Sequence, residues 1–363
     1  MTGRPYALAG RGDGETRLVD FVASQVLPLW LVIAGNAVMI ASLWLLGAGG
    51  MMAKLILLVF WVMMLAAYGR NLHFKPAGLV GGLILCALIG LIGLGDGSPG
   101  EKIRLAGNLM MLPVGLAAGY VIGRDCLRIL VPSLALYLVL SSSFYLTHEG
   151  FRLNHAFLLL GFFALCSVMA LPGGRWAGGV AAIAILLSQT RIAVIAMLIN
   201  LVGGIRFGRA VTVLVGVTGL GIMAVLIARY LPRLLMTHDS GRLVFWQEFA
   251  DLWRDGPPSR QWLGFGAGSV EEILSGSSSF ASFGALHNDH FRILFETGMV
   301  GAILWFWAWG MMIWSVRQVR LSVCILISVF VTMVTDNSLN YGHYLMCTAI
   351  ASGIAARTGG PRE

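Results

Sequence analysis

The sequence predicts an all-α polytopic membrane protein with about 12 transmembrane helices and one large outer loop between spans 9 and 10. Hydrophobic residues make up 58% of the 363 residues, charged residues make up only 12%, and long apolar runs recur along most of the chain. A soluble domain carries about 25% charged residues. Lipid must therefore be the solvent for most of this apolar surface.

The spans follow from the length of apolar sequence that crosses a bilayer, which is about 20 residues. On this criterion the predicted spans are residues 26–46, 51–68, 77–95, 105–122, 126–146, 155–171, 177–190, 192–205, 211–228, 297–315, 321–335 and 343–356. Residues 23–357 are then one transmembrane domain between two cytoplasmic tails, residues 1–22 and 358–363. The first tail is polar, unlike the apolar segment of a cleavable signal.

The orientation depends on residues 177–205, which form either one long helix or two short helices broken at Gln189, Thr190 and Arg191. With two helices and a cytoplasmic N-terminus, most basic residues lie in cytoplasmic segments. The short outer connections and helix ends then hold only Lys54, Lys102, Arg104, Arg152 and Arg191. A single helix would reverse everything after it and remove this bias. The positive-inside rule therefore favours two helices and places Arg191 at the outer surface.

The same orientation places residues 229–296 outside as one long loop, whereas every other connection is short. A loop of this length in a compact protein is usually functional. Residues 242–254 have apolar side chains at helical spacing, which predicts an amphipathic helix at the membrane interface. Residues 255–284 are rich in Gly, Ser and Pro and are expected to be irregular. Residues 287–296 are expected to be helical and to lead into the next span.

Three short motifs in and near this loop resemble the signature of the O-antigen ligase and O-antigen polymerase superfamily. The first is His287-Asn288, seven residues, Glu296-x-Gly298 and then Gly301. The second is Gly241-Arg242-Leu243-Val244-Phe245-Trp246 followed by Leu263-Gly264-x-Gly266, and the third is Ser188-Gln189-Thr190-Arg191. They stand in the family's order across residues 177–305, with Thr190 where the family usually has Ser.

The resemblance implies a glycosyltransferase of the bacterial cell inner membrane with a periplasmic active site. Such an enzyme moves a glycan from an undecaprenyl-diphosphate carrier to an acceptor hydroxyl, by direct displacement with inversion. Lipid A core or another glycan is the implied acceptor, and membrane lipids surround the protein. The resemblance also implies metal independence. The sequence shows no metal-ligand spacing, and no cofactor is expected.

Charge and acid–base chemistry suggest roles for five residues. The leaving diphosphate gains negative charge, and arginine binds phosphate oxygens at two points with a charge that does not titrate, so Arg191 and Arg242 are catalytic candidates. His287 is the candidate general base for the acceptor hydroxyl, or the residue that orients that hydroxyl. Asn288 and His290 are candidates for binding acceptor sugars.

Other interpretations remain open at the level of sequence. His287 is otherwise a solvated loop residue, Arg191 an interfacial anchor and Arg242 a residue of a polar helix face. Asp336 and Asn337 fall at the outer end of a span, where side chains are able to line the site.

The function has alternatives as well. An O-antigen polymerase uses the same donor, although the fit of His287 favours the ligase, and protein O-glycosylation is a further possibility. A transporter also accounts for twelve spans, but the charges lie at the faces rather than at the midplane. The net charge of +8 reflects cytoplasmic basic residues, and no nucleic acid partner is expected.

Overall fold

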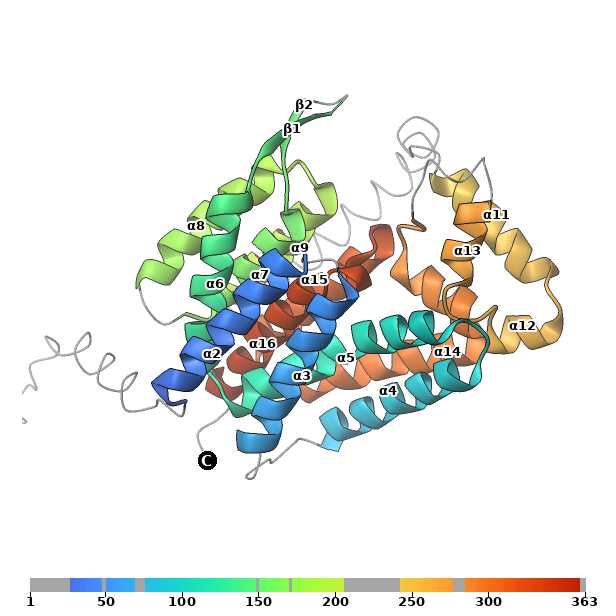
Figure 1. Cartoon of the computed structure of the whole chain (residues 1–363), viewed down its shortest axis with the longest axis horizontal. Coiled ribbons are helices and arrows are strands. Elements are labelled where there is room, and N and C mark those ends of the chain that lie inside the picture. The colour runs from blue at the N-terminus through green and yellow to red at the C-terminus, as the bar shows by residue number, and fades with distance from the viewer. Residues whose placement is uncertain are drawn as a thin grey trace, which may run out of the picture.

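The computed structural model describes residues 27–47, 50–68, 76–147, 150–169, 172–205, 242–276 and 285–359. Within these ranges the protein is helical apart from one short hairpin (Figure 1). The predicted span 211–228, the start of the predicted loop, residues 1–22 and the last four residues lie outside the described ranges.

Helices cover each predicted span that falls in the described ranges. The first eight are α2 (Leu29–Ile40) with the π-helix η1 (Ala41–Leu45), α3 (Met51–Tyr68), α4 (Pro76–Leu94), α5 (Pro99–Val121), α6 (Asp125–Ser141), α7 (Ala156–Ser167), α8 (Pro172–Leu187) and α9 (Arg191–Gly204). The later ones are α11 (Arg242–Asp255), α12 (Pro258–Leu263), α13 (Ser269–Gly276), α14 (Asp289–Ser315), α15 (Arg320–Thr335), the 3₁₀-helix η3 (Ser338–Asn340) and α16 (Gly342–Gly359).

The lengths and apolar surfaces of these helices suit a bilayer. In the described ranges, three helices are long and apolar enough to cross a membrane, namely α3, α4 and α14, and several other apolar helices are shorter. Large apolar side chains face outward, including Leu83 at 69% exposure and Val139 at 78%. Such exposure is unfavourable in water and favourable in lipid. The fold therefore fits a helical membrane protein.

The predicted break near residue 190 is confirmed, because α8 ends at Leu187 and α9 begins at Arg191. Gln189 adopts a left-handed backbone with φ of 52°. The amide of Thr190 donates to the hydroxyl of Ser188 at 3.3 Å, which provides a local partner where the helical ladder stops. The chain therefore forms two helices here instead of one.

The prediction of a helix through residue 146 is wrong, because α6 ends at Ser141 and a hairpin follows. Strand β1 (Phe144–Thr147) pairs antiparallel with β2 (Gly150–Leu153). Asn154 closes this hairpin, since its side chain donates to the carbonyl of Ser141 and accepts from the amide of Ser143, both at 3.1 Å. The local serines offer the backbone such alternatives to the helix.

Small residues bring the central helices α5 and α16 into close contact. A Cβ atom at Gly119 would lie 2.1 Å from the carbonyl oxygen of Ile350, and one at Gly353 would lie 2.3 Å from that of Leu116. Only glycine permits this separation of backbones, a common device for packing helices within membranes.

Helix α14 is divided by a sharp turn at Gly298, where φ is 69° and ψ is −171°. The indole nitrogen of Trp305 donates to Nδ1 of His290 at 3.0 Å. These two residues are 15 positions apart in the sequence, which in a straight helix would separate them by about 22 Å at 1.5 Å per residue. Residues 289–297 must therefore fold back along residues 299–315.

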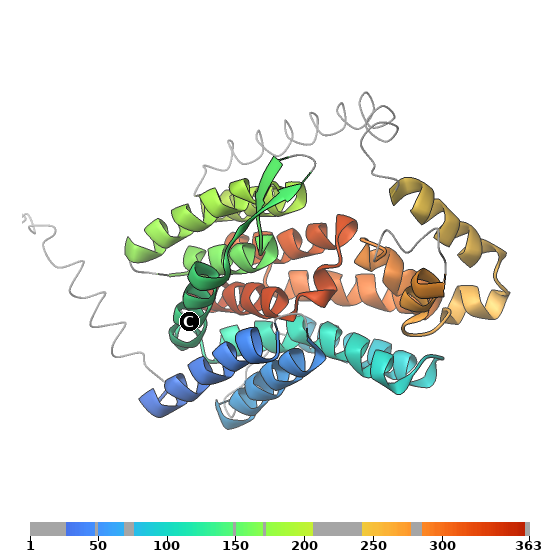
Figure 2. The same cartoon turned by 45° about the horizontal axis from the view of Figure 1, so that its top comes forward.

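The elements of the predicted outer loop gather beside this turn, and α11, α12 and α13 lie together at one side of the molecule (Figure 1; Figure 2). The predicted amphipathic helix is confirmed as α11. Its apolar face packs on protein, since Phe245 and Phe249 are buried and the ring of Phe249 meets that of Phe295 at 5.1 Å. The position of this helix at the membrane interface stays a prediction. The expectation of an irregular segment is wrong where α12 and α13 form.

We expect Gly298→Ala to lower the free energy of unfolding by about 1–3 kcal/mol, because this backbone conformation is accessible essentially to glycine alone. A Cβ atom there would also lie 2.4 Å from the backbone of Trp262. Thermal unfolding in detergent measures the change. Gly310→Ala is the matched control, because it lies in the same helix with no neighbour within 4 Å of its Cβ position. Equal stabilities of the two variants would contradict this account of the turn.

Candidate functional site

Four connections meet at one end of the helices, and three of them line an open cavity of about 490 Å³. These three are the β1–β2 hairpin, the α8–α9 turn and the α15–α16 connection, and the segment before α14 contacts the last of them. The rings of Tyr137, Tyr145, Phe157 and Tyr341 line this cavity, together with the polar side chains of His155, Thr190, Asp336 and His343. We call it the aromatic cavity. Its volume is within the range of small-molecule sites, about 300–1,000 Å³.

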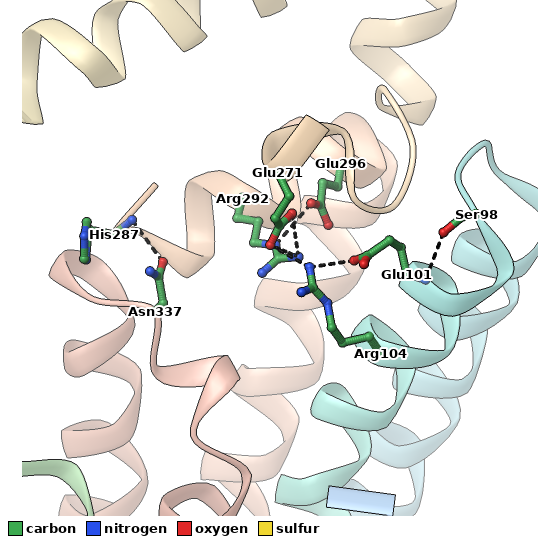
Figure 3. A network of polar contacts seen from close by, with 8 residues as sticks. All are labelled: Ser98, Glu101, Arg104, Glu271, His287, Arg292, Glu296 and Asn337. Atoms are coloured by element: carbon green, nitrogen blue, oxygen red, sulfur yellow. Dashed lines mark hydrogen bonds and ion pairs between the residues drawn. The ribbon is translucent and has the colours of Figure 1, made fainter. Parts of the chain in front are cut away.

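His287 lies beside this cavity, in the segment that precedes α14. Its Nδ1 atom is 4.0 Å from Oδ1 of Asp336, and 26% of its side chain is exposed. Its backbone is left-handed, with φ of 54°, and its amide donates to Oδ1 of Asn337 at 3.0 Å (Figure 3). The amide of Leu339 donates in return to Oδ2 of Asp289 at 2.8 Å. Two reciprocal hydrogen bonds thus fix the histidine against the α15–α16 connection.

Arg191 is the first residue of α9, and its side chain is exposed. Thr190, directly before it, lines the aromatic cavity, as does Asp336. The predicted arginine and the predicted base therefore each adjoin a residue that lines the same cavity, Thr190 for Arg191 and Asp336 for His287.

Arg242 begins α11, and its side chain lies outside what the structure describes. One helical turn later, the indole of Trp246 donates to the carbonyl of Leu286 at 2.7 Å. Leu286 directly precedes His287. The start of α11 is therefore anchored to the segment that carries the predicted base.

The side chains of Asn288 and His290, which were predicted to bind acceptor sugars, form hydrogen bonds within the protein. The Oδ1 atom of Asn288 caps α14 by accepting from the amide of Phe291 at 2.9 Å. The Nε2 atom of His290 donates to the carbonyl of Phe330 at 3.0 Å, while its Nδ1 accepts from Trp305. Both ring nitrogens of His290 are therefore bonded within the protein, and its predicted role in binding acceptor sugars stays a prediction.

A second recess lies on the other side of the His287–Asn288 segment. It is an apolar groove of about 610 Å³ between α11 and the two legs of α14. Its walls include Trp246, Leu294, Met299, Ile303 and Phe306, with Asn288 at its polar edge. The predicted base therefore stands between a polar aromatic cavity and an apolar groove.

A network of ion pairs fastens the outer elements to the helices (Figure 3). Glu271 on α13 contacts Arg104 of α5 at 2.7 Å and Arg292 of α14 at 2.9 Å. Arg104 also pairs with Glu101 at 2.6 Å, and Arg292 with the fully buried Glu296 at 3.2 Å. Glu296, which belongs to the sequence motif, therefore has a structural role.

The glycine motif packs against the same turn. The amide of Phe265 donates to the carbonyl of Phe295 at 2.9 Å, and that of Gly266 to Glu296 at 3.0 Å. A Cβ atom at Gly264 would lie 2.3 Å from the carbonyl oxygen of Glu296. Two of the motif pieces that carry the family resemblance are thus direct packing partners, although they are far apart in the sequence.

The aromatic rings that line the cavity were not predicted from the sequence. Tyr341 stacks on Phe157 with ring centroids 4.9 Å apart and an angle of 21° between the planes. Burial and the nearby carboxylates raise the pKa of Tyr341 to about 12. Tyr137 and Phe157 lie in helices, and Tyr145 and Tyr341 lie in connections, so no single stretch of sequence contains the four rings.

No protein-family model matches this chain, and no curated protein matches it. The fold defines a class, a helical protein with helices suited to a membrane. The resemblance to the O-antigen ligase and polymerase superfamily stays a prediction, carried by the three motifs.

The ion-pair network gives a testable prediction about the outer elements. We expect Glu271→Gln to lower the stability of residues 242–276 by about 1–3 kcal/mol, because two guanidinium groups lose their shared carboxylate. Hydrogen exchange of that segment measures the effect. Glu272→Gln changes an exposed neighbour on the same helix and is the control. The same exchange rates in both variants would show that the network does not hold the loop.

Proposed function

We propose that this protein is a membrane glycosyltransferase of the O-antigen ligase type. It transfers an undecaprenyl-diphosphate-linked glycan to an acceptor hydroxyl on lipid A core. One observation carries the proposal: the His287–Asn288 segment stands between the aromatic cavity and the apolar groove. The donor is itself divided in this way, because a diphosphate joins a polar glycan to a long apolar prenyl chain. The glycan suits the cavity, and the prenyl chain suits the groove.

The reaction is a single displacement at the anomeric carbon of the donor sugar. The acceptor oxygen forms a bond to this carbon, and the bond from the carbon to the diphosphate oxygen breaks. The leaving diphosphate takes the electron pair, and the proton of the acceptor hydroxyl passes to His287. Attack opposite the leaving group inverts the anomeric configuration.

The charged residues of the site have different roles in the proposed reaction. Arg191 and Arg242 stabilise the charge that develops on the diphosphate, since guanidinium groups bind phosphate oxygens at two points. Asp336, 4.0 Å from Nδ1 of His287, stabilises the imidazolium formed when the histidine accepts a proton. Asn337 holds the backbone of His287 and is a positioning residue.

We propose that this end of the helices faces the periplasm of a bacterial inner membrane. The distribution of basic residues supports this orientation. At the opposite end of the helices, Arg128 and Arg357 bond to backbone carbonyls at 3.3 and 2.6 Å, and Arg317 and Arg320 stand at the turn between α14 and α15. The short connections at this opposite end carry more basic residues than those at the site end, where Lys102, Arg104, Arg152 and Arg191 lie, and such an excess is typical of a cytoplasmic face.

We expect Arg191→Ala to lower kcat by about 10²–10³-fold through loss of leaving-group stabilisation. We expect His287→Ala to lower it by about 10²–10⁴-fold through loss of the base. The measurement uses purified protein in detergent, a synthetic undecaprenyl-diphosphate oligosaccharide and lipid A core. Arg254→Ala is the control, because this arginine of the outer elements pairs with Asp251 on an exposed surface. Near-normal transfer by either site variant would remove that residue from the mechanism.

Deletion of the gene tests the acceptor in the cell. We expect long glycan chains to accumulate unattached to lipid A core, which gel analysis of surface polysaccharide detects. Single repeat units on lipid A core would instead identify a polymerase. An unchanged glycan pattern with loss of solute uptake would identify a transporter and overturn the proposal.

A further inference from the structure

The aromatic cavity has a chemical character that the transfer step alone does not require. Polar groups for that step, Asp336 beside His287 and Thr190 beside Arg191, occupy only part of its wall. Four aromatic rings from four separate elements line the rest. Aromatic faces next to hydrogen-bonding groups are suited to sugars, whose rings have apolar C–H faces and polar edges.

Tyr341 is the ring best placed to receive a ligand. Phe157 is buried and stacks on one face of Tyr341, whereas Tyr341 itself is 40% exposed. The supporting ring sets the plane of Tyr341, and the connection that contains η3 sets its position. A rigid aromatic ring with one face open loses little conformational entropy when a ligand stacks on it.

The edge of the cavity offers hydroxyl partners around this platform. Tyr145 reaches the cavity from the hairpin, and Asp336 reaches it from the same connection as Tyr341. The Tyr341 hydroxyl is protonated at neutral pH, as tyrosine hydroxyls ordinarily are, and is a hydrogen-bond donor. A phenol donates a hydrogen bond and a carboxylate accepts one, so the two groups together are suited to bind the hydroxyls of a sugar.

The geometry points to a saccharide-binding site in this cavity, with one sugar ring stacked on the open face of Tyr341 and its hydroxyls bonded by Tyr145 and Asp336. The inference rests on the proposed function for the identity of that sugar. The reacting anomeric carbon must lie between the leaving group at Arg191 and the base at His287. The sugar in the cavity is therefore the donor sugar that is attached to the diphosphate.

Binding of simple glycosides tests the site without any transfer reaction. The full chain in detergent is titrated with methyl glycosides of glucose, N-acetylglucosamine, galactose and rhamnose, and saturation-transfer difference NMR records the contacts. We expect at least one glycoside to receive saturation at its ring C–H protons. We expect Tyr341→Ala to weaken that binding about tenfold, through loss of the stacking contact.

Two further variants separate the contributions. Tyr341→Phe keeps the ring and is expected to retain most of the binding, whereas Tyr145→Ala on the exposed hairpin is expected to weaken it. Tyr120→Ala is the control, because Tyr120 lines a different cavity with Ser315 and Ala356 near the opposite end of the helices.

The outcomes distinguish this inference from the proposed function. Absence of glycoside contacts in the unaltered protein, or equal binding by the Tyr341→Ala and Tyr120→Ala variants, would overturn the saccharide site. Glycoside binding that depends on Tyr341 would support the site even if the protein transferred no glycan, and such a result would reject the transferase alone. Transfer with an unchanged KM in Tyr341→Ala would reject the site and leave the transferase standing.

Discussion

The reversal of the chain at Gly298 is the constraint on which the candidate site depends. With φ of 69° and ψ of −171°, this residue sends residues 289–297 back along the membrane-suited leg of α14. His290 then meets Trp305 and Phe330, and His287 reaches the α15–α16 connection. A continuous helix would carry the histidine away from that connection by 1.5 Å for every residue. The conformation of this one glycine thereby decides whether His287 and the aromatic cavity are neighbours.

After this turn, hydrogen bonds from backbone amides to side chains join the segment at the start of α14 to the α15–α16 connection. His287 donates to Asn337, and Leu339 donates to Asp289, which is fully buried. The two bonds join the start of α14 to the α15–α16 connection at neighbouring positions. These two segments therefore cannot move past each other without breaking both bonds. The proposed transfer reaction would need such fixed geometry, because a general base acts only within hydrogen-bond reach of the proton it removes.

The helices and the break before Arg191 were predictable, because apolar length and basic residues at one membrane face are properties of local sequence. The motifs also single out His287 on the strength of local spacing alone. The roles of His290 and Glu296 were not predictable, since each depends on partners brought together by the turn: Trp305 and Phe330 for one, Arg292 for the other. The aromatic cavity was missed for a similar reason, because its rings come from separate elements that no local pattern connects.

The ion pairs bear on which arginines the proposed site could use for a diphosphate. Arg104, Arg260 and Arg292 each contact a carboxylate at 2.5–2.9 Å, and Arg292 is only 4% exposed. A phosphate would have to compete with those carboxylates, and Arg292 would also have to leave Glu296, whose side chain is fully buried. These arginines hold the outer elements against α5 and the α4–α5 turn. In the proposed mechanism the diphosphate is therefore assigned to Arg191, which directly follows the cavity residue Thr190.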